Sequence, residues 1–186
     1  MLTLCSVWLP ILLSAVFVFA VSSIIHMFTP WHKSDVRKVP SEEAVMDALR
    51  SFAIPPGDYM LPRCESMADM KSPEFRAKVE RGPVMAFTMM PNGGVNMGKS
   101  LVLWFLYSVA ISAAVAFVCV HTVERGASCH RLCGVAGITA WLAYSGALWQ
   151  ASIWYGRSWA TTIKTSIDGA IYAAVTAATL CWLWPH

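Results

Sequence analysis

The sequence predicts an all-α integral membrane protein with four transmembrane helices and a cytoplasmic connection of about 70 residues between the first helix and the second. Of the 186 residues, 56% are hydrophobic and only 13% are charged, and average soluble domains carry about twice that charged fraction. The charges are also unevenly placed, because ten of the 14 Lys and Arg and nine of the 11 Asp and Glu fall between Lys33 and Lys99. The remainder of the chain consists largely of long uncharged stretches.

Each predicted span is a run of about 20 apolar residues, the length that a helix needs to cross a hydrocarbon core about 30 Å thick. The four spans cover residues 5–28, 100–121, 134–155 and 166–184. The fourth is the most polar at its start, where Asp168 is expected at or just inside the membrane interface. There it would cap the N-terminal end of the helix and could pair with Lys164 or Arg157.

The first span is interpreted as a retained anchor, because no Lys or Arg precedes it and its apolar stretch is longer than that of a typical signal peptide. The alternative is a cleaved signal peptide, since Ala20, Ser22 and Ser23 resemble a processing site. With alternating spans, the two sides of the membrane carry 12 and two Lys and Arg residues. The positive-inside rule then places both termini outside the plasma (inner) membrane and the connection 29–99 in the cytoplasm.

Small residues at four-residue spacing predict the faces on which the later spans pack, because lipid-embedded helices associate by close backbone approach. Three spans carry such a set, and chance in alanine-rich helices is the alternative. The three sets are Ser108, Ser112 and Ala116; Ala143, Ala147 and Ala151; and Gly169, Ala173 and Ala177.

The connection 29–99 is expected to contain two short helices. Ser41, followed by two glutamates, predicts the N-cap of a helix over about 42–53. Ser72 followed by Pro73 predicts a second helix that ends before Gly82. The stretch 84–90 could form a short strand, and 55–58 a turn. Eight of the ten prolines lie in this connection, so it is expected to pack on the membrane surface or on a partner rather than around a core of its own.

One string, Gly93-Gly94-Val95-Asn96-Met97-Gly98-Lys99-Ser100, fits the phosphate-binding pattern G-x-x-x-x-G-K-[ST] at every specified position. Its context argues against nucleotide binding, because the helix that follows is a membrane span and the connection is too short for a parallel sheet. The favoured interpretation is a flexible turn before a span, in which Lys99 reaches the lipid headgroups and Ser100 caps the helix.

A spacing of sulfur-containing residues is the basis for a metal-handling alternative. Cys64, Met67 and Met70 follow one another at three-residue intervals, and thiolate and thioether sulfurs suit Cu(I). The same spacing also describes the apolar stripe of a short amphipathic helix, because Met fills irregular contacts. Packing is therefore the favoured interpretation, and a copper ion is the alternative.

Histidines and further cysteines gather at the two predicted interfaces. His26 and His32 belong to the inner end of the first span, whereas His121 lies at the outer end of the second, so the two groups cannot share one iron. A pigment on His26 is chemically possible without any further signal. In the outer connection, the open alternatives are a zinc site, a Cys129–Cys133 disulfide, or free interfacial residues. The candidate zinc ligands are His121, Cys129, His130 and Cys133.

The sequence therefore predicts a non-catalytic accessory or scaffolding subunit of a larger membrane assembly, an energy-transducing complex being one option. Its expected partners are the lipid bilayer and other membrane-protein subunits. Nucleic acid is excluded, because no basic stripe interleaved with aromatic residues is present. No nucleophile with its base and no close pair of carboxylates in an apolar setting is found. The alternatives are a copper or other metal-handling protein and a small transporter, whose polar cavity would be lined by Tyr144, Gln150, Thr161 and Asp168.

Overall fold

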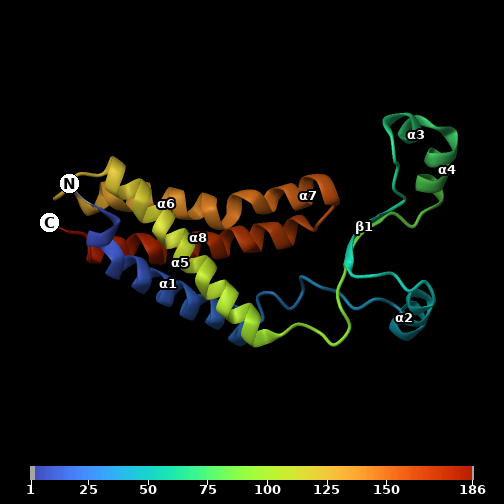
Figure 1. Ribbon diagram of the computed structural model, residues 1–186, viewed down its shortest axis with the longest axis horizontal. Helices are drawn as coiled ribbons and strands as arrows, with labels where there is room; N and C mark the ends of the chain where they lie inside the picture. Colours follow the sequence, from blue (N-terminus) through green and yellow to red (C-terminus); the bar gives the residue numbers. More distant parts are fainter. Residues whose placement is uncertain (1–2, 186) are drawn as a thin grey trace. The chain divides into compact units, whose positions relative to one another are not determined.

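The computed structural model describes residues 3–185, which are mostly helical. The described residues divide into two compact units, one made of residues 3–37 and 96–185 and the other of Lys38–Val95. The first unit is a helical bundle, and the second combines short helices with a hairpin (Figure 1).

Three helical stretches of the bundle are long and apolar enough to cross a membrane. The first, Leu4–Phe28, consists of the 3-10 helix η1 (Leu4–Val7), the α-helix α1 (Trp8–Ser23) and the π-helix η2 (Ile24–Phe28). The second is α5 (Met97–Thr122). The third consists of α6 (Cys129–Ser145), the 3-10 turn η3 (Gly146–Leu148) and α7 (Trp149–Tyr155). These three stretches overlap the first three predicted spans and support an all-α membrane protein.

The last helix, α8 (Trp159–Trp182), is more polar than the other three stretches and is not counted with them. It begins seven residues before the predicted fourth span, so it includes Lys164 and a series of Ser and Thr residues. Asp168 consequently lies in the third turn of α8 and is buried. The expectation that Asp168 caps the N-terminal end of this helix is wrong, because the helix starts further upstream.

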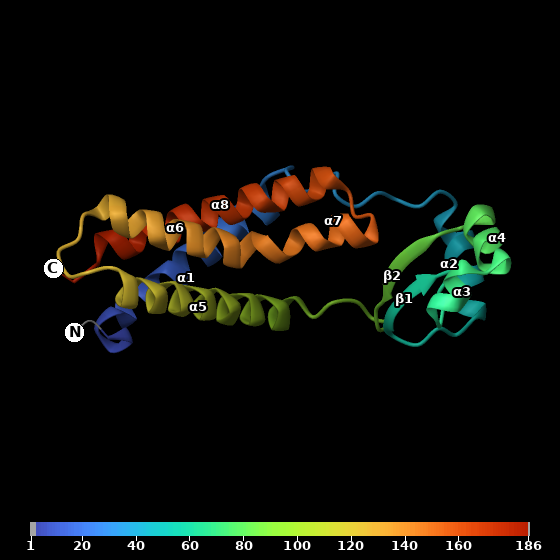
Figure 2. The same cartoon turned by 90° about the horizontal axis from the view of Figure 1, so that it is seen from above.

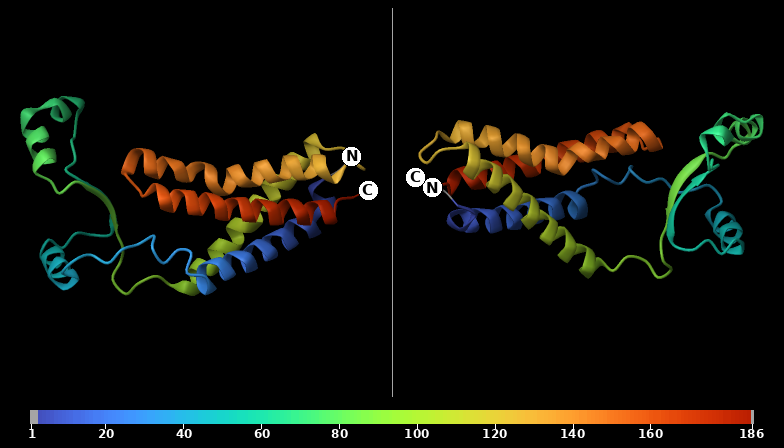
Figure 3. Two further views of the ribbon diagram at one scale, coloured as in Figure 1. Left: turned by 180° about the vertical axis from the view of Figure 1, so that it is seen from behind. Right: turned by 45° about the horizontal axis from the view of Figure 1, so that its top comes forward.

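The four long helices form a closed arrangement, in which α1 and α6 each pack against both α5 and α8 (Figure 2). The pair α6 and α8 makes the most extensive contact, and the two helices run side by side in every view (Figure 3). Small and β-branched residues fill the interior, with larger apolar side chains such as Leu132 and Leu180 fully buried near one end.

Two of the three small-residue sets lie in this interior. Ser108, Ser112 and Ala116 on α5 are buried, and so are Gly169, Ala173 and Ala177 on α8. The third set differs, because Ala143 and Ala147 are exposed and Ala151 is only partly buried. The buried face of α6 is instead formed by residues of a neighbouring stripe, Leu132, Ala136, Ala140 and Tyr144.

Gly169 marks the point where α8 comes closest to α6. A Cβ atom placed on Gly169 would lie 3.3 Å from the Cβ of Ser145 and 3.4 Å from the Cβ of Tyr144, and it would collide with the Ser145 hydroxyl. A larger residue at position 169 therefore requires at least that the Ser145 side chain move, whereas glycine permits the close approach of the two helices as it stands.

The second unit contains a two-stranded antiparallel sheet and three helices. Strand β1 (Gly57–Leu61) pairs with β2 (Met85–Met89), with Tyr59 opposite Phe87. Helix α2 (Glu42–Ser51) precedes β1, and α3 (Met67–Lys71) and α4 (Pro73–Arg81) lie between the strands in sequence. Strand β2 falls within the expected strand 84–90. Strand β1 begins inside the stretch interpreted as a turn, and α3 is a third helix where two were expected.

The helix caps differ in part from those expected. Ser72 caps α4, because its hydroxyl accepts a hydrogen bond from the Phe75 amide at 3.1 Å. Ser41 does not cap α2, since its backbone is left-handed and its side chain makes no cap bond. At the start of α5, Asn96 is the cap and accepts a bond from the Lys99 amide at 3.0 Å. Ser100 therefore lies inside the helix, and the predicted Ser100 cap is wrong.

Candidate functional site

A cluster of charged and aromatic side chains lies where the chain leaves α1 and passes the first turns of α8. We call it the charged cluster, and it consists of His26, Trp31, His32, Asp35, Lys164, Asp168 and Tyr172. His26 lies in the π-helix η2, a type of helix that often occurs at functional sites. The chain then turns, with the Asp35 amide bonded to the His32 carbonyl at 3.0 Å, which brings His32 and Asp35 back towards α8.

Four ionisable side chains form the centre of this cluster. Asp168 Oδ2 lies 2.8 Å from His32 Nε2, and His32 Nδ1 lies 2.6 Å from Asp35 Oδ2. Asp35 Oδ1 in turn accepts a bond from Lys164 Nζ at 2.9 Å. A carboxylate only accepts hydrogen bonds, so His32 donates from Nδ1 to Asp35. The contact between His32 Nε2 and Asp168 Oδ2 is close, but it does not have hydrogen-bond geometry, and both atoms are buried without a hydrogen-bond partner among the described residues.

Two further contacts hold Lys164 and Asp168 in place. Lys164 Nζ also donates to the Trp31 carbonyl oxygen at 2.9 Å and to Ser34 Oγ at 2.8 Å, and it lies 5.6 Å from the centre of the Trp31 ring. Trp31 Nε1 donates to Asp168 Oδ1 at 3.1 Å. Trp31, in the turn after α1, therefore contacts both charged residues of α8, Lys164 and Asp168.

The two carboxylates of this cluster are largely buried. The side chain of Asp168 is 5% exposed and that of Asp35 is 12% exposed, and buried carboxylates persist only when they are paired and hydrogen-bonded. The hydrogen bond from His32, together with the bond and the charge of Lys164, holds the pKa of Asp35 below its usual value, against the opposing effect of burial. Asp35 is consequently ionised in the folded protein at neutral pH.

His26 completes the cluster on its exposed side. Its ring stacks on that of His32 with centroids 4.4 Å apart, and its Nε2 lies 3.3 Å from the Tyr172 hydroxyl. The ligand atoms of His26, His32 and Asp168 all lie within 4.8 Å of one another. Asp168 on α8 lies 136 or more positions after the two histidines in the sequence.

An apolar groove of about 560 Å³ opens beside the charged cluster. Its apolar lining includes Ile25, Ile167 and Ile171, and Trp31, Lys164 and Asp168 also line it. The sequence predicted a transporter cavity lined by Tyr144, Gln150, Thr161 and Asp168. Only Asp168 of these four lines the groove, and Tyr144 packs instead among Trp104, Tyr107 and Tyr172.

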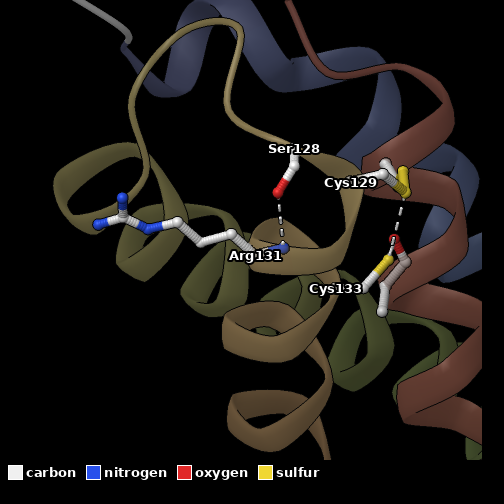
Figure 4. The surroundings of a disulfide bond; sticks show 6 residues. Ser128, Cys129, Arg131 and Cys133 are labelled. Carbon is white, nitrogen blue, oxygen red and sulfur yellow. Dashed lines mark hydrogen bonds between the residues drawn. A yellow bond between two sulfur atoms is a disulfide. The ribbon is translucent and has the colours of Figure 1, made fainter.

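A second group, of three cysteines, lies near the start of α6 and the end of α8 (Figure 4). Cys129 forms a disulfide with Cys181, with Cα atoms 5.4 Å apart. Cys133, one turn after Cys129, remains free, with its sulfur 3.6 Å from that of Cys129. The disulfide considered from the sequence, Cys129–Cys133, is thus replaced by a bond to a cysteine 52 positions away. His121 and His130 do not belong to this group of possible metal ligands.

The predicted copper ligands lie in the unit Lys38–Val95. Met67 and Met70 are on α3 with exposed side chains, and Cys64 precedes that helix with its side chain partly exposed. No interaction joins the three sulfur atoms among the described hydrogen bonds and contacts, so the copper interpretation stays a prediction.

Sequence reasoning missed most of the charged cluster. It noticed His26, His32 and Asp168 separately and expected Asp168 to pair with Lys164 or Arg157, whereas the structure pairs it with His32 and Trp31. Asp35, Trp31 and Tyr172 carry no local motif. The available signal was the ionisable pair Lys164 and Asp168 within an otherwise apolar helix, which usually marks function.

Comparisons with models of known families, with curated proteins and with solved structures give no match.

Proposed function

We propose that the protein is a non-catalytic, multi-pass membrane protein that serves as an accessory or scaffolding subunit, with the unit Lys38–Val95 as the part that binds a partner protein. One observation carries this proposal. Every described residue of Lys38–Val95 is at least partly exposed, and none is buried. A segment of this length with two strands and three helices has apolar side chains that it does not cover by itself.

Helix α2 shows this most clearly. Val45, Met46 and Leu49 lie along one side of the helix, followed by Phe52 just beyond its end, and all four side chains are exposed. The hairpin and the segments around α3 add further exposed apolar residues, including Met60, Leu61, Met67, Met70, Met85 and Met90. Methionine is common on surfaces that bind protein partners, because its flexible side chain adapts to an irregular neighbour.

The charge of the unit favours a protein over an anionic membrane surface. Lys38–Val95 carries seven Lys and Arg and eight Asp and Glu, whereas segments that bind anionic lipid headgroups are clusters of bases. An exposed apolar helix face bordered by balanced charges is typical of helix recognition by a protein groove.

The proposed topology has four spans, with α8 as the fourth. Its 24 residues extend over about 36 Å, enough to cross the hydrocarbon core. The two charges that make α8 polar, Lys164 and Asp168, are both paired within the charged cluster, which lowers the cost of placing them at the membrane interface. We accordingly assign the charged cluster to the cytoplasmic interface and both termini to the outside.

The disulfide supports this orientation independently of the count of charges. Both ends of the described chain lie at the same end of the bundle as the start of α6 (Figures 1 and 3), where Cys129 pairs with Cys181. Disulfides persist in oxidising compartments, such as the periplasm or the cell exterior.

The test of the proposed function is the mass of the particle released from native membranes by a mild detergent. A subunit should migrate far above its own 20.4 kDa together with defined partners. The double variant Met46→Glu/Phe52→Glu should lose these partners while it remains in the membrane fraction.

The matched control is Asp47→Ala/Arg50→Ala, which removes an ion pair from the same helix and leaves its apolar side chains intact. This control should retain the partners. A wild-type chain extracted as a monomer or a simple homodimer would refute the proposal, as would partners that both double variants retain equally.

A further inference from the structure

We propose that His26, His32 and Asp168 form a binding site for a divalent first-row transition-metal ion such as Zn²⁺ or Fe²⁺. The site lies in the charged cluster, and its existence does not depend on the proposed role as an accessory subunit.

The ligand set is the first observation behind this proposal. One ring nitrogen of each histidine and a carboxylate oxygen of Asp168 lie within 4.8 Å of one another, and His32 Nε2 is 2.8 Å from Asp168 Oδ2. Ligands about 2.1 Å from a common metal ion are about 3.0–3.4 Å apart in octahedral or tetrahedral geometry, so a small opening of this pair admits one ion. Two imidazoles and one carboxylate suit Zn²⁺ and Fe²⁺, whereas Mg²⁺ and Ca²⁺ prefer oxygen ligands and Cu(I) prefers sulfur.

The second observation concerns the residues that form hydrogen bonds with these ligands. His32 donates its other ring nitrogen, Nδ1, to Asp35 at 2.6 Å, and metal-bound histidines almost always make such a bond to a carboxylate or carbonyl. Asp168 accepts a bond from Trp31 at its second oxygen, Oδ1, which leaves Oδ2 directed at His32. His32 and Asp168 are therefore each held in orientation by a hydrogen bond at the atom opposite the one that would bind the metal.

Two buried ligand atoms lack a partner that a metal ion would supply. His32 Nε2 and Asp168 Oδ2 are buried without a hydrogen-bond partner among the described residues, although they lie 2.8 Å apart. A neutral His32 that donates from Nδ1 to Asp35 offers its Nε2 lone pair to the ion, and a proton held on Nε2 would leave to solvent when the ion binds. His26 must also turn out of its stacked position so that its lone pair points at the ion. Its exposed side chain leaves room for this rotation.

The groove supplies access to the open side of the site. Asp168 and Trp31 line it together with isoleucine side chains, so an ion held by three protein ligands would keep its remaining coordination positions towards an apolar space. Three ligands with open positions are typical of sites that bind a further small ligand, whereas structural zinc sites are closed by four.

The experiment is a titration of the full-length chain with Co²⁺, after the protein has been purified in detergent on an affinity tag without histidine and stripped with EDTA. Visible absorption of the bound Co²⁺ reports stoichiometry and ligand type, and Zn²⁺ is then added as a competitor. We expect one equivalent of Co²⁺, bound by nitrogen and oxygen ligands and displaced by Zn²⁺.

Three variants test the ligands and their support. Asp35→Asn should weaken Co²⁺ binding by about 10–100-fold, the usual effect of losing a group behind a ligand, and His26→Ala and Asp168→Asn should weaken it by more. Because Asp168 is buried, its variant could fail to fold, so circular dichroism and gel filtration accompany every titration. Because His26 is exposed, we expect His26→Ala to fold, so this variant still tests the site if Asp168→Asn does not fold.

The matched controls are His121→Ala and His130→Ala, which change histidines outside the charged cluster, and Cys133→Ser, which removes a free thiol beside the disulfide. All three should bind Co²⁺ like the wild type. The proposal is overturned if the wild type binds no Co²⁺, if His26→Ala binds it with unchanged affinity, or if the spectrum shows thiolate charge transfer that Cys133→Ser abolishes.

Discussion

Asp168 shows at the level of a single residue how this protein accommodates a charge between apolar helices. A carboxylate at this depth is costly unless charged and hydrogen-bonding groups surround it. Trp31 and His32 provide one contact to each of its oxygens, and both come from the turn that follows the first apolar stretch. The most buried charge of α8 is thus stabilised by residues from the other end of the sequence.

Gly169, the next residue, permits the close approach of α8 to α6. We expect Gly169→Val to lower the free energy of unfolding by about 1–3 kcal/mol, the usual cost of adding volume to a packed interior, because the new side chain meets Ser145 and Tyr144. Thermal unfolding in detergent provides the measurement. Gly134→Ala on α6 is the control, since nothing lies within 4 Å of its added Cβ, and an equal loss in both variants would contradict this account.

At the level of the element, Ser72 and Ser41 were both predicted as N-caps of helices in the connection, and replacing each with Ala gives a matched comparison. Ser72→Ala should destabilise the start of α4 by about 1 kcal/mol, because the Phe75 amide loses its acceptor. Hydrogen exchange of the α4 amides should become about fivefold faster as a result. Ser41→Ala should leave the exchange of α2 unchanged, since Ser41 makes no cap bond. Faster exchange in α2 after this second change would show that Ser41 caps the helix in solution.

The disulfide makes a second prediction about elements, because it joins the start of α6 to the end of α8. Peptide mapping without reduction should recover Cys129 linked to Cys181. Replacing Cys181 with Ser should lower the free energy of unfolding by about 2–4 kcal/mol, as expected for a closed loop of this size. Cys5→Ser, at an exposed free thiol, should have no effect. Recovery of Cys129 linked to Cys133 would contradict the pairing.

Local patterns predicted the elements well where the determining contacts are local. The second helix of the connection follows from Ser72, Pro73 and Gly82, which lie within about three turns of each other, and the structure has α4 in this position. Strand β1 was missed because Pro55, Pro56 and Gly57 favour a turn. It is the pairing with β2, whose residues lie 24 or more positions away, that makes Gly57–Leu61 a strand.

At the level of the whole molecule, the number of spans decides on which sides the two ends of the chain lie. Four spans place Cys5 and the C-terminus on the same side, and three spans place them on opposite sides. A membrane-impermeant thiol reagent added to intact cells should label Cys5 without lysis, and Cys64 only after lysis. A protease-sensitive tag at the C-terminus should be cleaved from the outside as well.

The buried thiol Cys119 is the internal control and should stay unlabelled before and after lysis. Labelling of Cys64 in intact cells would reverse the proposed orientation. A tag cleaved only after lysis, with Cys5 labelled before it, would instead leave α8 on one side of the membrane and reduce the number of spans to three.

The charged cluster is the part of the molecule that sequence patterns could least predict. His26 and His32 were placed correctly near one end of the first apolar stretch, yet their partners on α8, Tyr172 for His26 and Asp168 for His32, lie more than 130 positions later. No spacing rule connects residues across that separation, because the contact depends on how α1 and α8 pack. The start of α8 was also predicted too late, because the prediction relied on the apolar run and the first two turns of the helix are rich in Thr.

The last helix is held at both of its ends by different chemistry. Near its C-terminal end a covalent bond ties it to α6, and near its N-terminal end ion pairs tie it to the turn after α1. Helix α8 is thus attached at two points, one covalent and one ionic. Release of either attachment leaves the other in place, so reduction of the disulfide and a change of charge in the charged cluster would free different ends of the same helix.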